Sequence, residues 1–155
     1  MAEVYGEAFL ETVRDKLVAL MTALKTTMAA GYDPTFSYVY ETHDVAKLQL
    51  NAVSVAGGDS YEDQPLWSGE HTSRHMVEFT IRVHTNYADD NVGIDDQKNA
   101  RLLNSIITKL LTNLDMGDYY RFEGITELKV AEDFGMTTGG ELTCVVSVSI
   151  EYTQE

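Results

Sequence analysis

Cysteine, proline and long apolar runs are scarce in this 155-residue chain. The chain has two prolines and a single cysteine, Cys144. With one cysteine, no internal disulfide can form. A lone thiol favours assembly in the cytosol over secretion. No apolar run approaches the roughly 20 residues that span a bilayer, and the first residues lack the basic start and short apolar core of a signal peptide. We therefore expect one globular domain over residues 1–155, with no membrane partner.

Basic residues are also few. Eleven Lys and Arg stand against 25 Asp and Glu, which gives a formal net charge of −14. The segments Gly57–Glu70, Asn86–Gln97 and Glu132–Glu155 contain acids and no Lys or Arg. Holding phosphates by counterion release requires clustered Lys and Arg, so specific nucleic-acid binding is disfavoured. The acidic surface either keeps the protein soluble or faces something negative without adhering to it.

The segment Ala100–Leu114 predicts a central helix. Its apolar residues recur at steps of three and four and form one broad stripe: Leu102, Leu103, Ile106, Ile107, Leu110, Leu111 and Leu114. On either side of it, His75–Thr85 and Leu142–Tyr152 alternate apolar and polar residues as strands do. In the first strand, Glu78, Thr80, Arg82 and His84 are expected on the polar face. Asp95 or Asp96 is expected as the N-cap of the central helix.

The remaining patterns complete an α+β fold of order α-β-β-β-α-β-β, with a mixed or antiparallel sheet of about four to five strands covered by helices. Glu3–Ala30 is an amphipathic helix, Leu48–Val55 a strand, Ile125–Ala131 a strand, and the chain closes on a β-hairpin. Asp33–Lys47 alternates weakly and is not assigned. Two flexible loops are expected near residues 57–72 and 132–141.

The predicted N-terminal helix carries acids at steps of four on its polar side, namely Glu3, Glu7, Glu11 and Asp15. Like charges at this spacing repel by a few tenths of a kcal/mol per pair. Two interpretations remain open. The stripe is either a solvated helix face, or it lines a shared cavity or meets a basic partner.

The predicted loop at Gly57–Glu70 holds the only tryptophan, Trp67, beside Leu66. Long loops in compact domains are usually functional or disordered. The pair Leu66-Trp67 either folds back onto the core or anchors a neighbouring subunit, as exposed aromatic residues often do.

The sequence contains no convincing catalytic set. His71 and His75 lie four apart but straddle a loop and a strand, without the Glu of a zinc-protease helix. Asp89–Asp95 resembles the start of a calcium loop, but its twelfth position is Ala100 and not a Glu. Cys144 alternates with apolar residues, where a thiol behaves as a small hydrophobe. We therefore predict no catalytic residue, metal or cofactor, and no enzyme.

Taken together, the order of elements resembles the tail terminator proteins of long-tailed (siphovirus-type) bacteriophages. The segments that carry the resemblance are the N-terminal helix, RHMVEFTIRVHTNY at Arg74–Tyr87, the helix ARLLNSIITKLL, and DFGMTTGGELTCVVSVSIEY at Asp133–Tyr152. In that family a long helix leads into strands, a second helix covers the sheet, and a hairpin ends the chain. The likeness covers nearly the whole chain and rests on pattern.

The resemblance implies a structural protein of the virion tail or neck, assembled in the host cytoplasm. Family members form a homohexameric ring that caps the tail tube, ends its polymerisation and joins the head, so the implied partners are further copies of the chain, the tail tube protein and head-tail connector proteins. DNA passes through the ring without being specifically bound. Under this reading Glu3, Glu7, Glu11 and Asp15 are candidates for an acidic lumen, because carboxylates repel phosphates.

The same reading makes Leu66, Trp67, Phe134 and Met136 candidates for the assembly interface. Removal of Gly135–Gly139 is then expected to leave a folded domain that fails to cap tails. Three alternatives remain: another phage neck or tail-completion connector, an acidic DNA-mimic inhibitor that binds a basic protein, and a small-molecule enzyme or binding domain with a deep pocket.

Overall fold

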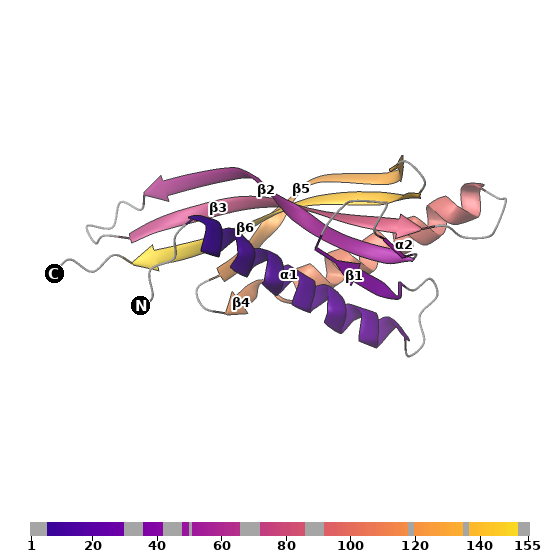
Figure 1. Ribbon diagram of the computed structural model, residues 1–155, viewed down its shortest axis with the longest axis horizontal. Helices are drawn as coiled ribbons and strands as arrows, with labels where there is room; N and C mark the ends of the chain where they lie inside the picture. Colours follow the sequence, from indigo (N-terminus) through magenta and orange to yellow (C-terminus); the bar gives the residue numbers. More distant parts are fainter. Residues whose placement is uncertain are drawn as a thin grey trace.

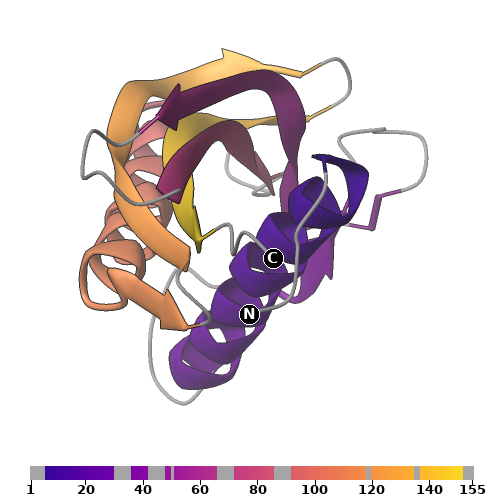
Figure 2. The same cartoon turned by 90° about the vertical axis from the view of Figure 1, so that its left-hand side faces the viewer.

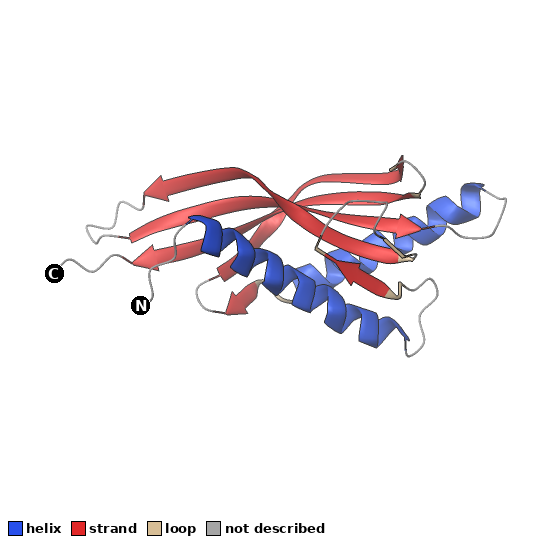
Figure 3. Ribbon diagram, viewed as in Figure 1, coloured by secondary structure: helices blue, strands red, loops and turns tan. Residues whose placement is uncertain are grey.

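The described part of the chain folds as an α+β domain with two helices and one six-stranded sheet (Figures 1 and 3). A computed structural model describes residues 6–29, 36–41, 48–49, 51–65, 72–85, 92–117, 120–134 and 137–151. The elements in chain order are α1 (Gly6–Ala29), β1 (Tyr38–Tyr40), β2 (Ala52–Pro65), β3 (Thr72–Thr85), α2 (Val92–Leu111), β4 (Asp115–Gly117), β5 (Tyr120–Asp133) and β6 (Thr138–Glu151). The α+β class expected from the sequence is confirmed.

The sheet is mixed and has the strand order β1-β2-β3-β6-β5-β4. Among the described strands, only the β1–β2 pair is parallel, and every other pair is antiparallel. Strand β6 pairs with β3 on one side and with β5 on the other, so the closing strand of the chain lies at the centre of the sheet. The long strands twist strongly and curl, so the sheet wraps around the helices (Figure 2).

Both helices pack on the same face of the sheet and contact each other. Helix α1 contributes Val13, Leu17, Met21 and Leu24, and α2 contributes Leu102, Leu103, Ile106 and Leu110. The sheet contributes the predicted apolar positions of β3 and β6: Val77, Phe79, Ile81, Val83, Leu142, Cys144, Val146 and Val148. The period-two patterns of these strands are confirmed, and Ile150 and Tyr152 lie outside the described side chains.

The number of strands is larger than the sequence predicted. The expected order α-β-β-β-α-β-β becomes α-β-β-β-α-β-β-β, because β4 adds a three-residue strand that pairs with the start of β5. Three residues are too few to show a period-two pattern, and Asp115–Gly117 resembled a helix end. In the weakly alternating segment, Tyr38–Tyr40 forms β1 and Phe36 is buried.

The loop expected near residues 57–72 is also different. Gly57–Pro65 continues β2 and pairs with β3 up to Ser73, while Leu66–His71 lies outside the described residues. Every residue before Pro65 carries the backbone groups that pair with a neighbouring strand, so polar side chains do not prevent a strand here. A register shift between Gly57 and Ser60 accommodates the extra residues. The second expected loop, residues 132–141, shrinks similarly, because β5 extends to Asp133 and β6 begins at Thr138.

Helix α2 begins earlier and ends sooner than predicted. It starts at Val92, so Asp95 and Asp96 lie inside its first turns and are not the N-cap. It ends at Leu111. Leu111 and Leu114, expected on the buried stripe, are 52% and 40% exposed. The stripe is interrupted because a turn follows Leu111 and redirects the chain toward β4.

Two glycines at the start of β6 let the layers approach closely. A Cβ at Gly139 would collide with the backbone carbonyl of Val83 on β3. A Cβ at Gly140 would collide with the side chain of Leu103 on α2 and lie 2.9 Å from the carbonyl oxygen of Lys129. Glycine at position 139 therefore lets β6 lie close to the backbone of β3, and glycine at position 140 permits the packing of α2 on the centre of the sheet.

Candidate assembly surface

The acidic stripe of α1 is solvent-exposed where its side chains are described. Glu11 and Asp15 are both exposed, one turn apart on the helix. The same line continues through the exposed small residues Ala19 and Ala23, so the described negative charge is confined to the N-terminal half of α1. Glu3 and the side chain of Glu7 lie outside the description. The helix presents carboxylates outward, as both interpretations of the stripe require.

Basic side chains beside this stripe hold α1 in place. Lys16 Nζ donates a hydrogen bond to the carbonyl oxygen of Met116, at 3.0 Å, and lies 5.0 Å from the centre of the Tyr120 ring. Arg14 Nε lies 3.9 Å from a carboxylate oxygen of Glu41, a surface ion pair of small energetic value. Lys16 therefore ties α1 to the β4–β5 end of the sheet.

Phe134 lies in the connection between β5 and β6 and packs against its own domain. Its ring centre is 5.5 Å from the ring centre of His84 and 4.9 Å from the guanidinium carbon of Arg82. Its backbone N–H also donates to the carbonyl oxygen of Thr137, at 2.9 Å. The expected interface residue Phe134 is thus half-buried in an intramolecular cluster. Leu66, Trp67 and Met136 lie outside the described residues.

The hairpin connection covers a buried histidine on the polar face of the sheet. His84 is fully buried, with Nε2 2.7 Å from Ser54 Oγ on β2 and Nδ1 3.2 Å from Thr137 Oγ1. Burial, helped by the nearby positive charge of Arg82, lowers the pKa of His84 to about 4. The sequence placed His84 on the polar face of β3, which is correct, but did not predict that Phe134 and Thr137 would cover it.

These contacts change the expectation for Gly135–Gly139. Thr137 is buried against His84, and Thr138 and Gly139 pair with both β3 and β5. Deleting the whole segment would remove the beginning of the central strand along with the connection. We therefore expect this deletion to disturb folding as well as assembly, and single substitutions are the better probe of this region.

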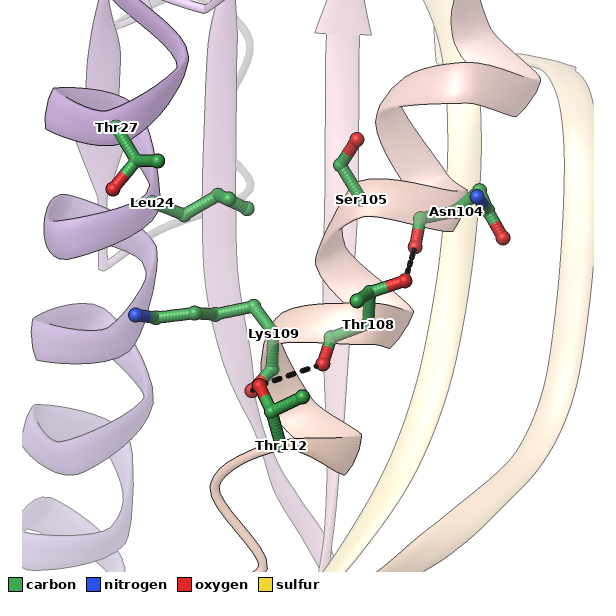
Figure 4. A pocket seen from close by; sticks show the side chains of 7 residues that line it. All are labelled: Leu24, Thr27, Asn104, Ser105, Thr108, Lys109 and Thr112. Atoms are coloured by element: carbon green, nitrogen blue, oxygen red, sulfur yellow. Dashed lines mark hydrogen bonds between the residues drawn. The ribbon is translucent and has the colours of Figure 1, made fainter.

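An open groove of about 310 Å³ lies between α1 and α2 (Figure 4). Leu24 and Thr27 line it from α1, and polar residues and one lysine line it from α2: Asn104, Ser105, Thr108, Lys109 and Thr112. The hydroxyl groups of Ser105, Thr108 and Thr112 donate to carbonyl oxygens of their own helix, as do many exposed helical Ser and Thr. Among the described residues that line it, Lys109 is the one with an ionisable side chain, and the groove has the character of a shallow polar surface.

The sequence did not single out the outer edge of β5. Leu128 and Val130 are 48% and 42% exposed, unusual for large apolar residues of a long strand. On this side of β5, β4 pairs only with Tyr120 and Arg121, and the Phe122 N–H donates a hydrogen bond to the carbonyl oxygen of Leu114, at 2.8 Å. Beyond Phe122, no described residue pairs with this side of β5. The sequence shows that Leu128 and Val130 alternate with charged residues, but it does not show that this part of β5 lies at an open edge of the sheet.

In the described ranges, no three His, Cys, Asp or Glu side chains gather closely enough to hold a metal ion. Neither described helix has the length and apolarity to cross a bilayer. No protein-family model matches the chain, and no curated protein does. The candidate surface must therefore be judged on its own chemistry.

Proposed function

We propose that this protein is a structural protein of phage-tail assembly, of the tail-terminator class, that forms a ring on the tail tube. The observation that carries the proposal is the arrangement of the elements. A long helix leads into the sheet, a second helix packs on the same face, and a closing hairpin supplies the central strand β6. This is the order of elements on which the resemblance to tail terminators rests.

Two surface features support a role in assembly. The first is the exposed carboxylates of Glu11 and Asp15 on a chain whose net charge is −14, which repel the phosphates of passing DNA. The second is the half-exposed apolar pair Leu128 and Val130 on a long strand. Exposed apolar residues on a sheet edge are typical of surfaces that another chain covers.

The proposed ring acts by geometry and charge. Copies arranged around an axis cover the last ring of tube subunits, which removes the surface on which the tube grows. An acidic inner wall leaves DNA free to slide, because unlike basic channels it offers no cation to hold the backbone. No covalent step or cofactor is required.

The test is polymerisation of the tail tube protein of the same phage with and without this chain, followed by electron microscopy. We expect tubes of limited length with an added ring at one end. A control with a heat-denatured sample keeps total protein constant. Tubes of unchanged length and without end density would refute the proposal.

The acidic DNA-mimic alternative predicts a different result. Such a protein acts as a monomer or dimer and binds a basic, nucleic-acid-binding protein with steep salt dependence. A neck connector would bind at the head side and leave tube length unchanged. The tube assay therefore separates a terminator from the other two hypotheses, and salt-dependent binding to a basic protein separates the DNA mimic from a neck connector.

A further inference from the structure

We propose that the side chains of Phe134 and Thr137 form an acid-released cover over His84, which opens while the rest of the sheet stays folded. We call these two side chains the histidine cover. The inference goes beyond the proposed function and does not rest on it, because it concerns the isolated chain. It starts from a buried polar cluster for which the proposed ring has no use.

The histidine cover is the side of this cluster that can move. Thr137 Oγ1 lies 3.2 Å from His84 Nδ1, and the centre of the Phe134 ring lies 5.5 Å from that of the imidazole. On the opposite side, His84 Nε2 lies 2.7 Å from the hydroxyl oxygen of the fully buried Ser54. Ser54 cannot withdraw without breaking strand pairing, because β1 pairs with it on one edge and β3 on the other.

The histidine cover also lies outside the strand ladder. Pairing between β5 and β6 reaches Thr138, so Phe134 and Thr137 come just beyond it. Thr138 is held independently of the cover, because its carbonyl oxygen lies 3.0 Å from the hydroxyl of Thr85 on β3. Within the cover, the Phe134 N–H donates to the carbonyl oxygen of Thr137, at 2.9 Å. Opening therefore breaks this bond and the contacts with His84, and leaves the pairing of β3 with β6 intact.

The surroundings of His84 favour its neutral form. Arg82 on the same strand adds a positive charge, and its guanidinium pairs with the carboxylate of Glu141 on β6. The described β2 side chains, Ala52–Ala56, include no ionisable group, and those of the cover are aromatic and hydroxyl. The acids at the end of β5, residues 132–133, have side chains outside the described residues. Burial, and to a smaller extent the charge of Arg82, lowers the pKa of His84 from 6.5 to about 4.

Protonation of His84 favours the open form. A charged imidazole donates from both ring nitrogens, and both neighbouring hydroxyl oxygens can accept, so the hydrogen bonds alone do not oppose the charge. Removal of the charge from water opposes it, together with repulsion from Arg82. Opening of the cover hydrates the ring and returns its pKa toward the ordinary value, so proton binding drives opening.

The two pKa values set the size of the effect. The closed form titrates near 4 and a hydrated imidazole near 6.5, so the ratio of open to closed molecules is constant well above pH 6.5, rises as the pH falls and levels off below 4. Between pH 7.5 and pH 5 this ratio should increase about 30-fold. Opening also separates the Phe134 ring from Arg82 and His84 and exposes an apolar side chain.

Amide hydrogen exchange followed by NMR tests the inference on the wild-type chain. Protection factors, which remove the intrinsic pH dependence of exchange, are compared at pH 7.5 and pH 5, with and without low urea. The Phe134 amide reports on the cover, because its bond to Thr137 breaks on opening. The slowest amides of the β3–β6 ladder report on the whole sheet.

We expect the Phe134 amide to be less protected than the ladder amides at both pH values and to lose about 30-fold in protection at pH 5. Its exchange should not change with low urea, because opening the cover exposes little surface. Exchange of the ladder amides should accelerate with urea, because it requires unfolding of the sheet.

Three variants separate titration from packing. His84→Gln cannot titrate, so the pH dependence at Phe134 should disappear. Thr137→Val keeps the shape of the side chain and removes the hydroxyl beside His84 Nδ1, so opening should be more frequent at pH 7.5 and keep its pH dependence. Thr138→Ala, at an exposed side chain next to the cover, is the matched control and should behave like the wild type.

Three results would overturn the inference. Exchange of Phe134 with the rate and urea dependence of the ladder amides would show that the connection opens only with the whole domain. Protection of Phe134 that is independent of pH in the wild type would show that no proton drives opening. Retained pH dependence in His84→Gln would assign the effect to another group. If His84→Gln does not fold, the wild-type and Thr137→Val profiles decide, since both must rise between pH 6.5 and pH 4.

Discussion

Ser54 Oγ on β2 lies 2.7 Å from His84 Nε2 on β3, and both side chains are fully buried. With Thr137 at the other ring nitrogen, the imidazole has a hydroxyl partner at each nitrogen. A neutral ring uses one nitrogen as donor and the other as acceptor, and hydroxyl groups accept either arrangement. The connection between β5 and β6 is thereby fixed to β3 through a histidine that prefers to be uncharged.

This preference predicts a pH-dependent stability. The pKa of His84 is lowered from 6.5 to about 4, so the unfolded chain binds a proton at this residue where the folded chain does not. Stability from His84 is complete above pH 6.5 and is lost as the pH falls toward 4, with a loss of about 2–3 kcal/mol. Urea unfolding at pH 7 and pH 5 measures it. The His84→Gln variant, which cannot titrate, should lose less stability between these pH values; an equal loss would refute this assignment.

Phe134→Ala tests whether that aromatic side chain serves the domain or an interface. Its contacts with Arg82 and His84 are intramolecular, so we expect the free energy of unfolding to fall by about 1–2 kcal/mol. Chemical denaturation of a dilute, monomeric sample measures this. Unchanged stability together with lost assembly would show instead that Phe134 contacts another subunit.

Gly139→Ala should be strongly destabilising. The added methyl group meets the backbone of Val83, which cannot rotate away as a side chain can, so we expect a loss of about 3 kcal/mol or more. Gly140→Ala meets mainly the side chain of Leu103 and should cost less. The neighbouring Thr138→Ala, at an exposed side chain, is the control in urea unfolding. Similar values for all three would refute the close-packing argument.

Cys144 should be unreactive in the folded protein. Burial, with a smaller contribution from the negative charge of Glu78, raises the pKa of its thiol to about 12, so almost no thiolate exists at neutral pH. We expect iodoacetamide at pH 8 to label the protein only in denaturant, as read by mass spectrometry. Rapid labelling without denaturant would show that the β6 core opens readily.

Charge reversal on α1 tests the proposed lumen. Glu11→Lys with Asp15→Lys should make assembled protein retain DNA at low salt, whereas the wild type should not. The control, Glu41→Lys with Asp115→Lys, changes the net charge equally at exposed residues outside α1 and away from the exposed edge of β5. Gel-shift assays on assembled samples compare them. If both variants retained DNA equally, α1 would have no special role in keeping DNA free.

The sequence predicted the helices and strands in which apolar residues recur at a regular spacing along one face. The core positions of β3 and β6 follow a period of two, and those of α1 and α2 follow steps of three and four, because each element buries one face. Glu11 and Asp15 were likewise predicted correctly as polar positions of a helix. These features depend on neighbours within a few residues, which the sequence contains directly.

The sequence alone therefore determined the α+β class, the amphipathic faces and the acidic surface. Tertiary structure decided the features that depend on distant partners. Gly57–Pro65 is a strand because β3 offers it a ladder, His84 is buried because Phe134 and Thr137 return over it, and Leu128 is half-exposed because β5 lies near the sheet edge. Backbone pairing is open to nearly every residue type, so which strands meet, and which edge stays open, is settled only when the whole chain packs.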